Sequence, residues 1–123
     1  FGLDKEGKNF STSQILLLGL AYKKNVDDDR ESVTFKVMEL LTKQGAQVDY
    51  NDPYIPFIKP RREYKQFVGK KSVPLENIDQ YDIAVILTDH STYDFEKIVE
   101  QSKVVVDTRN ACGAIKSNKI IKA

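Results

Sequence analysis

Short apolar segments recur along this chain, and most of them are rich in β-branched residues. The apolar positions are nearly continuous over 14–19, 83–87 and 103–106, whereas they alternate over 47–50. Continuous apolar strands are typical of a parallel sheet that is covered on both faces. We therefore predict strands over these four ranges.

A helix is predicted over 32–44, between the first two strands. Its apolar positions recur at helical spacing, and the stripe that we predict to face the core consists of Val33, Val37, Leu40 and Leu41. Ser32 stands where an N-cap residue belongs, and Gly45 stands just past the last helical position. The helix should therefore begin and end at these two residues.

Two further helical segments lie later in the chain. Over 94–101, the apolar residues that we expect to point inward are Phe95, Ile98 and Val99. One or two turns are expected over 75–80. Alternating strands and helices predict the α/β class, as a three-layer Rossmann-like domain with a mainly parallel sheet of about five to six strands.

The domain is expected to span 14–123. Residues 1–13 are polar, with two glycines and a Ser-Thr-Ser run, and we interpret them as a linker from missing upstream domains. The stretch 52–72 contains three prolines and many basic residues. It is too rich in proline for a central strand, so we expect a long excursion from the sheet.

Composition narrows the possible classes of protein. The 123 residues include 41% apolar and 30% charged residues, and the formal net charge is +1. This net charge is too small to create an electrostatic field that would favour nucleic acid or a membrane as partner. The apolar run from Ile15 is far shorter than the roughly 20 residues that span a bilayer, and no secretory signal is recognisable. We expect a soluble, cytoplasmic domain.

The chain has one cysteine, Cys112, and one histidine, His90. An internal disulfide is impossible, and a Cys-based or His-rich metal site is not expected. Because no second histidine offers a base, a buried or half-buried thiol is favoured over a nucleophilic Cys112. For His90, a hydrogen-bonded structural role is favoured over a catalytic one.

Charged residues follow the predicted strands. In a parallel sheet, ligands bind at the carboxyl ends of the strands, near the point where strand order reverses. The residues predicted to share that rim are Lys23, Arg30, His90 and Arg109. Lysine and arginine there would suit a phosphate-bearing ligand, helped by the amides at the start of the helix after Ser32.

Plainer interpretations stay open for the charged residues. Lys23 and Lys24 also fit solvated charges, and Arg30 also fits an ion pair with the acidic run 27–29. That run resembles half a metal site, but an exposed loop is favoured. The basic stretch 59–71, with Tyr64 and Phe67, is interpreted as a solvated loop rather than a nucleic-acid contact.

Two related folds are disfavoured by specific positions. The dinucleotide fingerprint G-x-G-x-x-G needs glycines where this chain has Ala21 and Lys24, so this domain should not cradle a whole dinucleotide. A receiver-type signalling domain has this length and fold. It needs an aspartate that ends the central strand and a lysine that ends the last, and the chain lacks that arrangement.

Five ordered motifs resemble the C-terminal domain of the UDP-glucose/GDP-mannose dehydrogenase family. They are Gly19-Leu-Ala-Tyr-Lys23, Asp28-Asp-Arg30-Glu-Ser32, Tyr50-Asn-Asp-Pro53, Thr88-Asp-His90 and Asp107-Thr-Arg-Asn110. The resemblance extends from about Gln14 to Ile115. The last two motifs look most like the branch that acts on UDP-N-acetylglucosamine or UDP-N-acetylmannosamine.

The resemblance implies a fragment of an NAD-dependent enzyme that oxidises the C6 alcohol of a UDP-sugar to the uronic acid, for bacterial surface polysaccharide synthesis. In this family an upstream cysteine forms the covalent intermediates, and Cys112 lies outside any such motif. NAD would be bound mainly by the missing N-terminal domain, and the complete enzyme would be a homodimer. This chain alone should be inactive, with no catalytic residue and no metal ligand.

The resemblance also assigns binding residues. Tyr22, Lys23 and Arg109 match positions that contact the UDP-sugar, and Arg30 matches an arginine that contacts NAD. One departure concerns Val33, which stands where the family usually has a proline that opens the helix. The alternative hypothesis is a stand-alone nucleotide-binding or regulatory module with the same fold.

Overall fold

The computed structural model describes residues 13–21, 23–25 and 32–123. Its centre is a five-stranded sheet in the order β2-β1-β3-β4-β5, with every neighbouring pair parallel. The strands are β1 (Gln14–Leu18), β2 (Gln47–Asn51), β3 (Ile83–Ile86), β4 (Val105–Asp107) and β5 (Ile120–Lys122). The α/β class, the parallel sheet and the predicted number of strands are confirmed.

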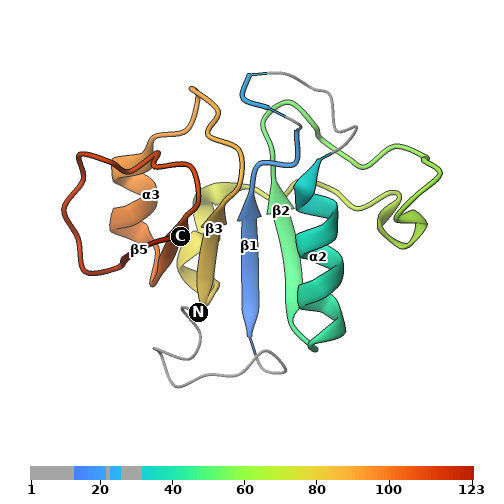
Figure 1. The fold of residues 1–123 in the computed structure, drawn as a ribbon, viewed down its shortest axis with the longest axis horizontal. Helices are drawn as coiled ribbons and strands as arrows, with labels where there is room; N and C mark the ends of the chain where they lie inside the picture. Colours follow the sequence, from blue (N-terminus) through green and yellow to red (C-terminus); the bar gives the residue numbers. More distant parts are fainter. Residues whose placement is uncertain (1–12, 22, 26–31) are drawn as a thin grey trace.

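Strand order reverses between β1 and β3. The chain leaves β1 towards β2 and then returns past β1 to begin β3, so the carboxyl ends of β1 and β3 flank the topological switch point. In Figure 1 the arrowheads of β1, β2 and β3 point to the same edge of the sheet, where the loops that follow them lie together. This edge is called the carboxyl edge below.

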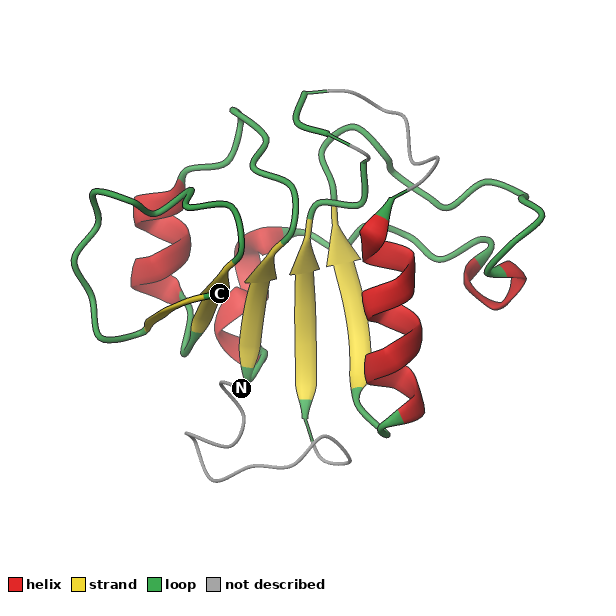
Figure 2. Ribbon diagram, viewed as in Figure 1, coloured by secondary structure: helices red, strands yellow, loops and turns green. Residues whose placement is uncertain are grey.

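Two apolar clusters cover the two faces of the sheet, because side chains alternate along each strand. One cluster joins Ile15 and Leu17 of β1 to α2 (Val33–Lys43) and to the segment after β2. The other joins Leu16 and Leu18 to α3 (Phe95–Gln101) and to the 3₁₀ helix η3 (Leu75–Gln80). Figure 2 shows α2 beside β2 and α3 beyond β3, so the molecule has the three predicted layers.

Helix α2 begins after its predicted cap. The Oγ atom of Ser32 accepts a hydrogen bond of 3.1 Å from the backbone N–H of Thr34, and Gly45 has a φ of 94° just past the end of the helix. The predicted inward stripe is only partly right, because Leu41 is buried and Val37 packs against the core, but Val33 and Leu40 do not face it. The side chains that α2 buries are Thr34, Phe35, Met38 and Leu41, whereas Val33 and Leu40 are exposed.

The long excursion after β2 takes part in the core. Ile55, Ile58 and Phe67 are buried against the α2 side of the sheet, and a 3₁₀ helix η2 (Lys65–Phe67) lies within the segment. The ring of Tyr64 stacks on that of Phe35, with 5.5 Å between centroids. The interpretation as a solvated loop is therefore wrong for the apolar side chains, although most of the basic ones are exposed.

Candidate functional site

Two of the four predicted cofactor- and substrate-binding residues lie within the described part of the chain. Lys23 follows β1 and Arg109 follows β4, and both are exposed. Because all the strands are parallel, both residues follow carboxyl ends. Only β3 separates β1 from β4, so the two strands lie roughly 10 Å apart. The structure thus puts both cations at the carboxyl edge, as the sequence predicts.

The other predicted residues lie outside the described residues. They are Tyr22 and Arg30, together with the acidic run 27–29. Their assignment therefore remains a prediction from the sequence.

A tight turn after β4 holds the backbone of Arg109. The Oδ1 atom of Asp107 accepts hydrogen bonds from the backbone N–H groups of Arg109, at 3.0 Å, and Ala111, at 3.1 Å. Its Oδ2 atom accepts one of 2.8 Å from the N–H of Cys112. Burial alone would raise the pKa of Asp107, but these three amides lower it below its ordinary value. A stable carboxylate therefore fixes the backbone of this turn.

A cavity of about 550 Å³ opens beside Arg109. Its lining comes from the last residues of β4 and β5 and from the segments after β3, β4 and β5, and consists of Asp89, Asp107, Thr108, Arg109, Asn110, Lys122 and Ala123. Lys122 donates a hydrogen bond of 3.2 Å from Nζ to Oδ1 of Asn110. Two cations, Arg109 and Lys122, thus line one polar cavity. The planar guanidinium of Arg109 and the compact ammonium of Lys122 could both bind an anionic ligand there.

Lys122 was missed by reasoning from the sequence. The available signal was the pair Ile120 and Ile121, which is β-branched and could have indicated a last strand ending at Lys122. The strand is short and only half-buried, so its apolar pattern is weak.

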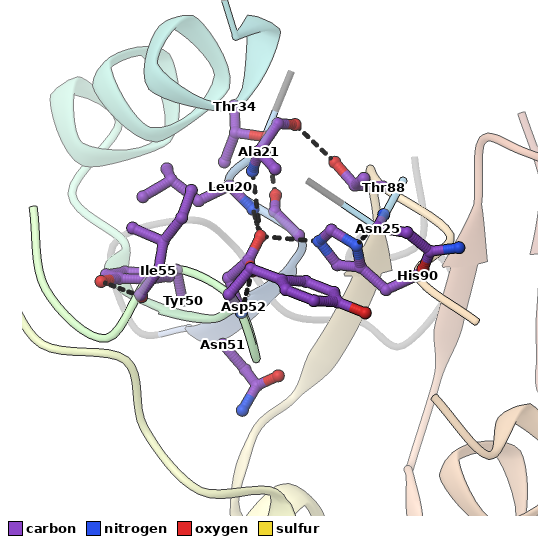
Figure 3. A network of polar contacts seen from close by, with 12 residues as sticks. Leu20, Ala21, Asn25, Thr34, Tyr50, Asn51, Asp52, Ile55, Thr88 and His90 are labelled. Atoms are coloured by element: carbon purple, nitrogen blue, oxygen red, sulfur yellow. Dashed lines mark hydrogen bonds and ion pairs between the residues drawn. The ribbon is translucent and has the colours of Figure 1, made fainter. Parts of the chain in front are cut away.

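A buried carboxylate, Asp52, connects the loops at the switch point (Figure 3). Its Oδ2 atom accepts hydrogen bonds from the backbone N–H groups of Leu20, at 2.8 Å, and Ala21, at 2.9 Å. The same oxygen lies 2.8 Å from Nε2 of His90, and both side chains are fully buried. Oδ1 accepts a bond of 2.8 Å from the N–H of Tyr54. This carboxylate thereby holds the segments after β1, β2 and β3 together.

His90 has hydrogen-bonding partners on both ring nitrogens. Besides Asp52, it contacts the loop after β1, where the backbone N–H of Asn25 lies 2.7 Å from Nδ1. The rings of Tyr54 and Tyr93 pack beside it, with centroids 4.8 Å and 5.7 Å away. The ring is thus buried and hydrogen-bonded on both sides, as the favoured interpretation expects, and a structural role for it stays a prediction.

Cys112 is a buried thiol, as favoured from the sequence. Burial, together with the negative charge of Asp107, raises its pKa to about 11. A thiol that stays protonated near neutral pH is a poor nucleophile. Cys112 therefore lacks the properties of a catalytic cysteine.

Two kinds of feature are absent from the described residues, 13–21, 23–25 and 32–123. Among these residues, no group of three or more His, Cys, Asp or Glu side chains is arranged to hold a metal ion. None of the helices in these ranges is both long and apolar enough to cross a membrane.

The family model for the UDP binding domain of UDP-glucose/GDP-mannose dehydrogenases matches residues 16–114. The chain belongs to this family. The matched range includes Lys23, His90 and Arg109 and ends before Lys122, so the fifth strand lies outside it. The dehydrogenase family resemblance, inferred from five motifs, is thereby confirmed.

Relatives of this UDP binding domain are dehydrogenases of UDP-sugars. The chain is 32% identical over 109 residues to a UDP-N-acetyl-D-mannosamine dehydrogenase of Methanococcus maripaludis, covering 79% of this chain and 22% of that protein. It is 30% identical over 89 residues to a UDP-N-acetyl-D-glucosamine 6-dehydrogenase of Salmonella typhi, covering 72% and 20%. The chain therefore spans about a fifth of the length of these curated relatives.

A solved structure has the same fold. The UDP-D-ManNAc dehydrogenase of Pyrococcus horikoshii aligns with a TM-score of 0.72 and 28% identity, over 98% of this chain and 27% of that one. In length, this UDP binding domain therefore corresponds to about a quarter of that chain.

Proposed function

We propose that this chain is the C-terminal nucleotide-binding domain of a longer NAD-dependent dehydrogenase. The complete protein would oxidise the C6 alcohol of a UDP-N-acetylhexosamine to the uronic acid, for surface polysaccharide synthesis. The observation that carries the proposal is the family match, together with two exposed cations at the carboxyl edge of a parallel sheet. The names of the relatives support the choice of UDP-sugar.

The domain's own task in this proposal is to bind the nucleotide end of the substrate. Lys23 supplies a compact charge and Arg109 a planar fork, and a pyrophosphate accepts both kinds of donor. Tyr22 would contact the same substrate, and Arg30 would contact NAD from across the domain cleft. Binding energy gathered here, away from the reacting carbon, helps to position C6 for oxidation.

The chemistry would take place outside this chain. Residues 1–13 would be the linker to central and N-terminal domains, which would supply the nucleophilic cysteine and most of the NAD site. The raised pKa of Cys112 supports that division, because its thiol is protonated near neutral pH. The complete protein would be a homodimer, and this domain alone would be inactive.

The proposal is tested by titrating the full-length protein with UDP in a calorimeter. Replacing Lys23→Ala or Arg109→Ala should weaken UDP binding at least about tenfold, since each removes a charge-assisted contact to phosphate. Matched controls are Lys24→Ala and Arg62→Ala, which remove the same charges from exposed positions, and they should change the Kd less than threefold. Equal effects of test and control variants would reject the assigned residues.

Activity is tested in the same protein. NADH formation should be seen with UDP-N-acetylglucosamine or UDP-N-acetylmannosamine, and Lys23→Ala should raise the KM for that sugar far more than the KM for NAD. Residues 1–123 alone should form no NADH with either sugar. Turnover by the isolated chain would contradict the division of tasks.

A further inference from the structure

The hydrogen bonds around His90 define which of its nitrogens carries the hydrogen. A backbone N–H can only donate, so Nδ1, which lies 2.7 Å from the N–H of Asn25, must accept and carries no hydrogen. Nε2 must then carry the hydrogen and donate it to Oδ2 of Asp52 at 2.8 Å. His90 is thus a neutral imidazole that joins a carboxylate on one side to a loop amide on the other.

Asp52 does not need His90 to be satisfied. Three backbone N–H groups, those of Leu20, Ala21 and Tyr54, already donate to its carboxylate. The contact that His90 alone adds is the one to Asn25, since the imidazole extends from the carboxylate to that amide. The ring therefore connects the buried carboxylate to Asn25, in the loop after β1.

Lys23 lies between two anchored residues of that loop. On one side, Ala21 donates to Asp52 and accepts a hydrogen bond of 2.9 Å from Oγ1 of Thr88. On the other side, Asn25 donates to His90, and its side chain exchanges two hydrogen bonds of 2.8 Å with Ser91. Figure 3 shows the contacts of Ala21 with Thr88 and Asp52, and that of Asn25 with His90.

The backbone at Asn25 needs this support. Its φ is 63°, in the left-handed region that non-glycine residues seldom adopt. Such a conformation persists where surrounding contacts over-determine it, and here one backbone and two side-chain hydrogen bonds do so. The backbone on both sides of Lys23 is therefore held by hydrogen bonds, buried ones at Ala21 and more exposed ones at Asn25, while the Lys23 side chain itself is exposed.

We propose that His90 is a positioning residue for nucleotide binding: through Asn25, its neutral imidazole holds the loop that presents Lys23 to the pyrophosphate. The inference rests on the proposed function, because it assumes that Lys23 binds the nucleotide. His90 touches neither substrate nor cofactor in this role, and it acts only by limiting where the lysine can be.

Two amide substitutions separate positioning from folding in the full-length protein. His90→Asn places Oδ1 near the position of Nδ1, so it keeps an acceptor for Asn25 and loses the donor to Asp52. His90→Gln places its amide near the position of Nε2, so it keeps the donor to Asp52 and loses the acceptor. Each variant thus removes one of the two hydrogen bonds of His90: His90→Asn removes the one to Asp52, and His90→Gln removes the one from Asn25.

The Kd for UDP and the melting temperature are measured for both variants. For His90→Gln we expect UDP binding to weaken about tenfold and the KM for the UDP-sugar to rise, with the KM for NAD unchanged. For His90→Asn we expect the larger fall in melting temperature, because its shorter side chain leaves space beside the rings of Tyr54 and Tyr93, with a Kd within threefold of the parent. If both variants weaken UDP binding equally, or if Kd simply follows melting temperature, the positioning role is overturned.

Lys23→Ala distinguishes this inference from the proposed function. If UDP does not bind the parent protein, or Lys23→Ala leaves the Kd unchanged, the proposed function fails and the inference fails with it. If Lys23→Ala weakens UDP binding while His90→Gln does not, only the positioning role fails.

A second variant keeps the test decisive if the His90 variants do not fold. Asn25→Gly leaves the buried pair of His90 and Asp52 intact and tolerates a φ of 63°, but it removes both bonds to Ser91 and frees the backbone. Because the backbone N–H of residue 25 still donates to His90, we expect UDP binding to change less than threefold, with little change in melting temperature. A tenfold loss would show that Ser91 rather than His90 holds the loop, and would overturn the proposal.

Discussion

Gly19 and Thr88 meet without room for a side chain between them. A Cβ atom on Gly19 would lie 2.6 Å from the backbone nitrogen of Thr88, and Gly19 has a φ of 101°. The end of β1 and the loop after β3 are thus packed together at the switch point, where open α/β sheets commonly bind ligands. His90 and Asp52 are also buried there, so protein side chains occupy the switch point, and in the proposed function the nucleotide binds outside them, beside Lys23 and Arg109.

Gly19→Ala should destabilise the domain strongly. The new methyl group would meet the Thr88 backbone, which cannot move aside as a flexible side chain does, and alanine is strained at this φ. We expect a loss of roughly 3 kcal/mol or more in the free energy of unfolding, measured with urea. Gly69→Ala is the matched control, because Gly69 has a φ of 87° and nothing within 4 Å of its Cβ position. It should lose only about 1–2 kcal/mol, and equal losses would contradict the close contact.

For helix α2, the sequence predicted the ends of the helix better than its buried face. Its limits followed from Ser32 and Gly45, but only part of the buried face did, since the helix has two overlapping apolar stripes and the predicted one shares Leu41 with the buried one. The position of Thr34 explains which stripe is buried. Its Oγ1 atom donates a hydrogen bond of 2.8 Å to the backbone oxygen of Gly19, so a polar residue is buried beside Phe35. Hydropathy assigns threonine to neither face, and this contact depends on tertiary structure.

Part of the candidate site could also be predicted from the sequence. Parallel strands put Lys23 and Arg109 at one edge, and this could be reasoned from the order of strands and charges. Asp52 could not be recognised, although it lies in a motif, because its role comes from backbone amides distant in sequence. An aspartate before a proline usually indicates a turn, and nothing local reveals that it is buried.

The excursion after β2 offers a test of its unexpected role in the core. Ile58→Ala should lower the free energy of unfolding by about 2–5 kcal/mol, because Ile58 is fully buried although it lies in a loop. The neighbouring Phe57 is 45% exposed, and Phe57→Ala should cost less than about 1 kcal/mol. Urea unfolding of both variants provides the comparison. A loss below about 1 kcal/mol for Ile58→Ala would mean that this side chain does not contribute to the core.

The thiol of Cys112 should make stability depend on alkaline pH. Its pKa is raised from the ordinary 9.0 to about 11 in the folded state, so the folded state keeps its proton where the unfolded state has lost it. The resulting stabilisation is present below pH 9 and is lost as the pH rises towards 11. Cys112→Ser, which does not titrate there, should show a shallower fall in the free energy of unfolding over that range. Parallel curves for variant and parent would contradict the raised pKa.

The carboxylate of Asp107 should act in the opposite direction, at acid pH. Hydrogen bonds from three amides hold its pKa below the ordinary value, against the effect of burial. Its stabilisation is therefore present above the pKa of the unfolded state, about 4, and is lost as the pH falls through the lower pKa of the folded state.

Asp107→Asn should lower the free energy of unfolding at pH 7 by about 1–3 kcal/mol and flatten its decline in acid. The amide group of asparagine cannot accept at both oxygen positions, so one of the N–H groups in the turn would lose its partner. Because that turn carries Arg109, UDP binding should also weaken. Asp79→Asn, at an exposed position, removes the same charge and should change neither quantity. A variant at position 107 that loses stability but keeps full UDP affinity would show that the turn does not position the arginine.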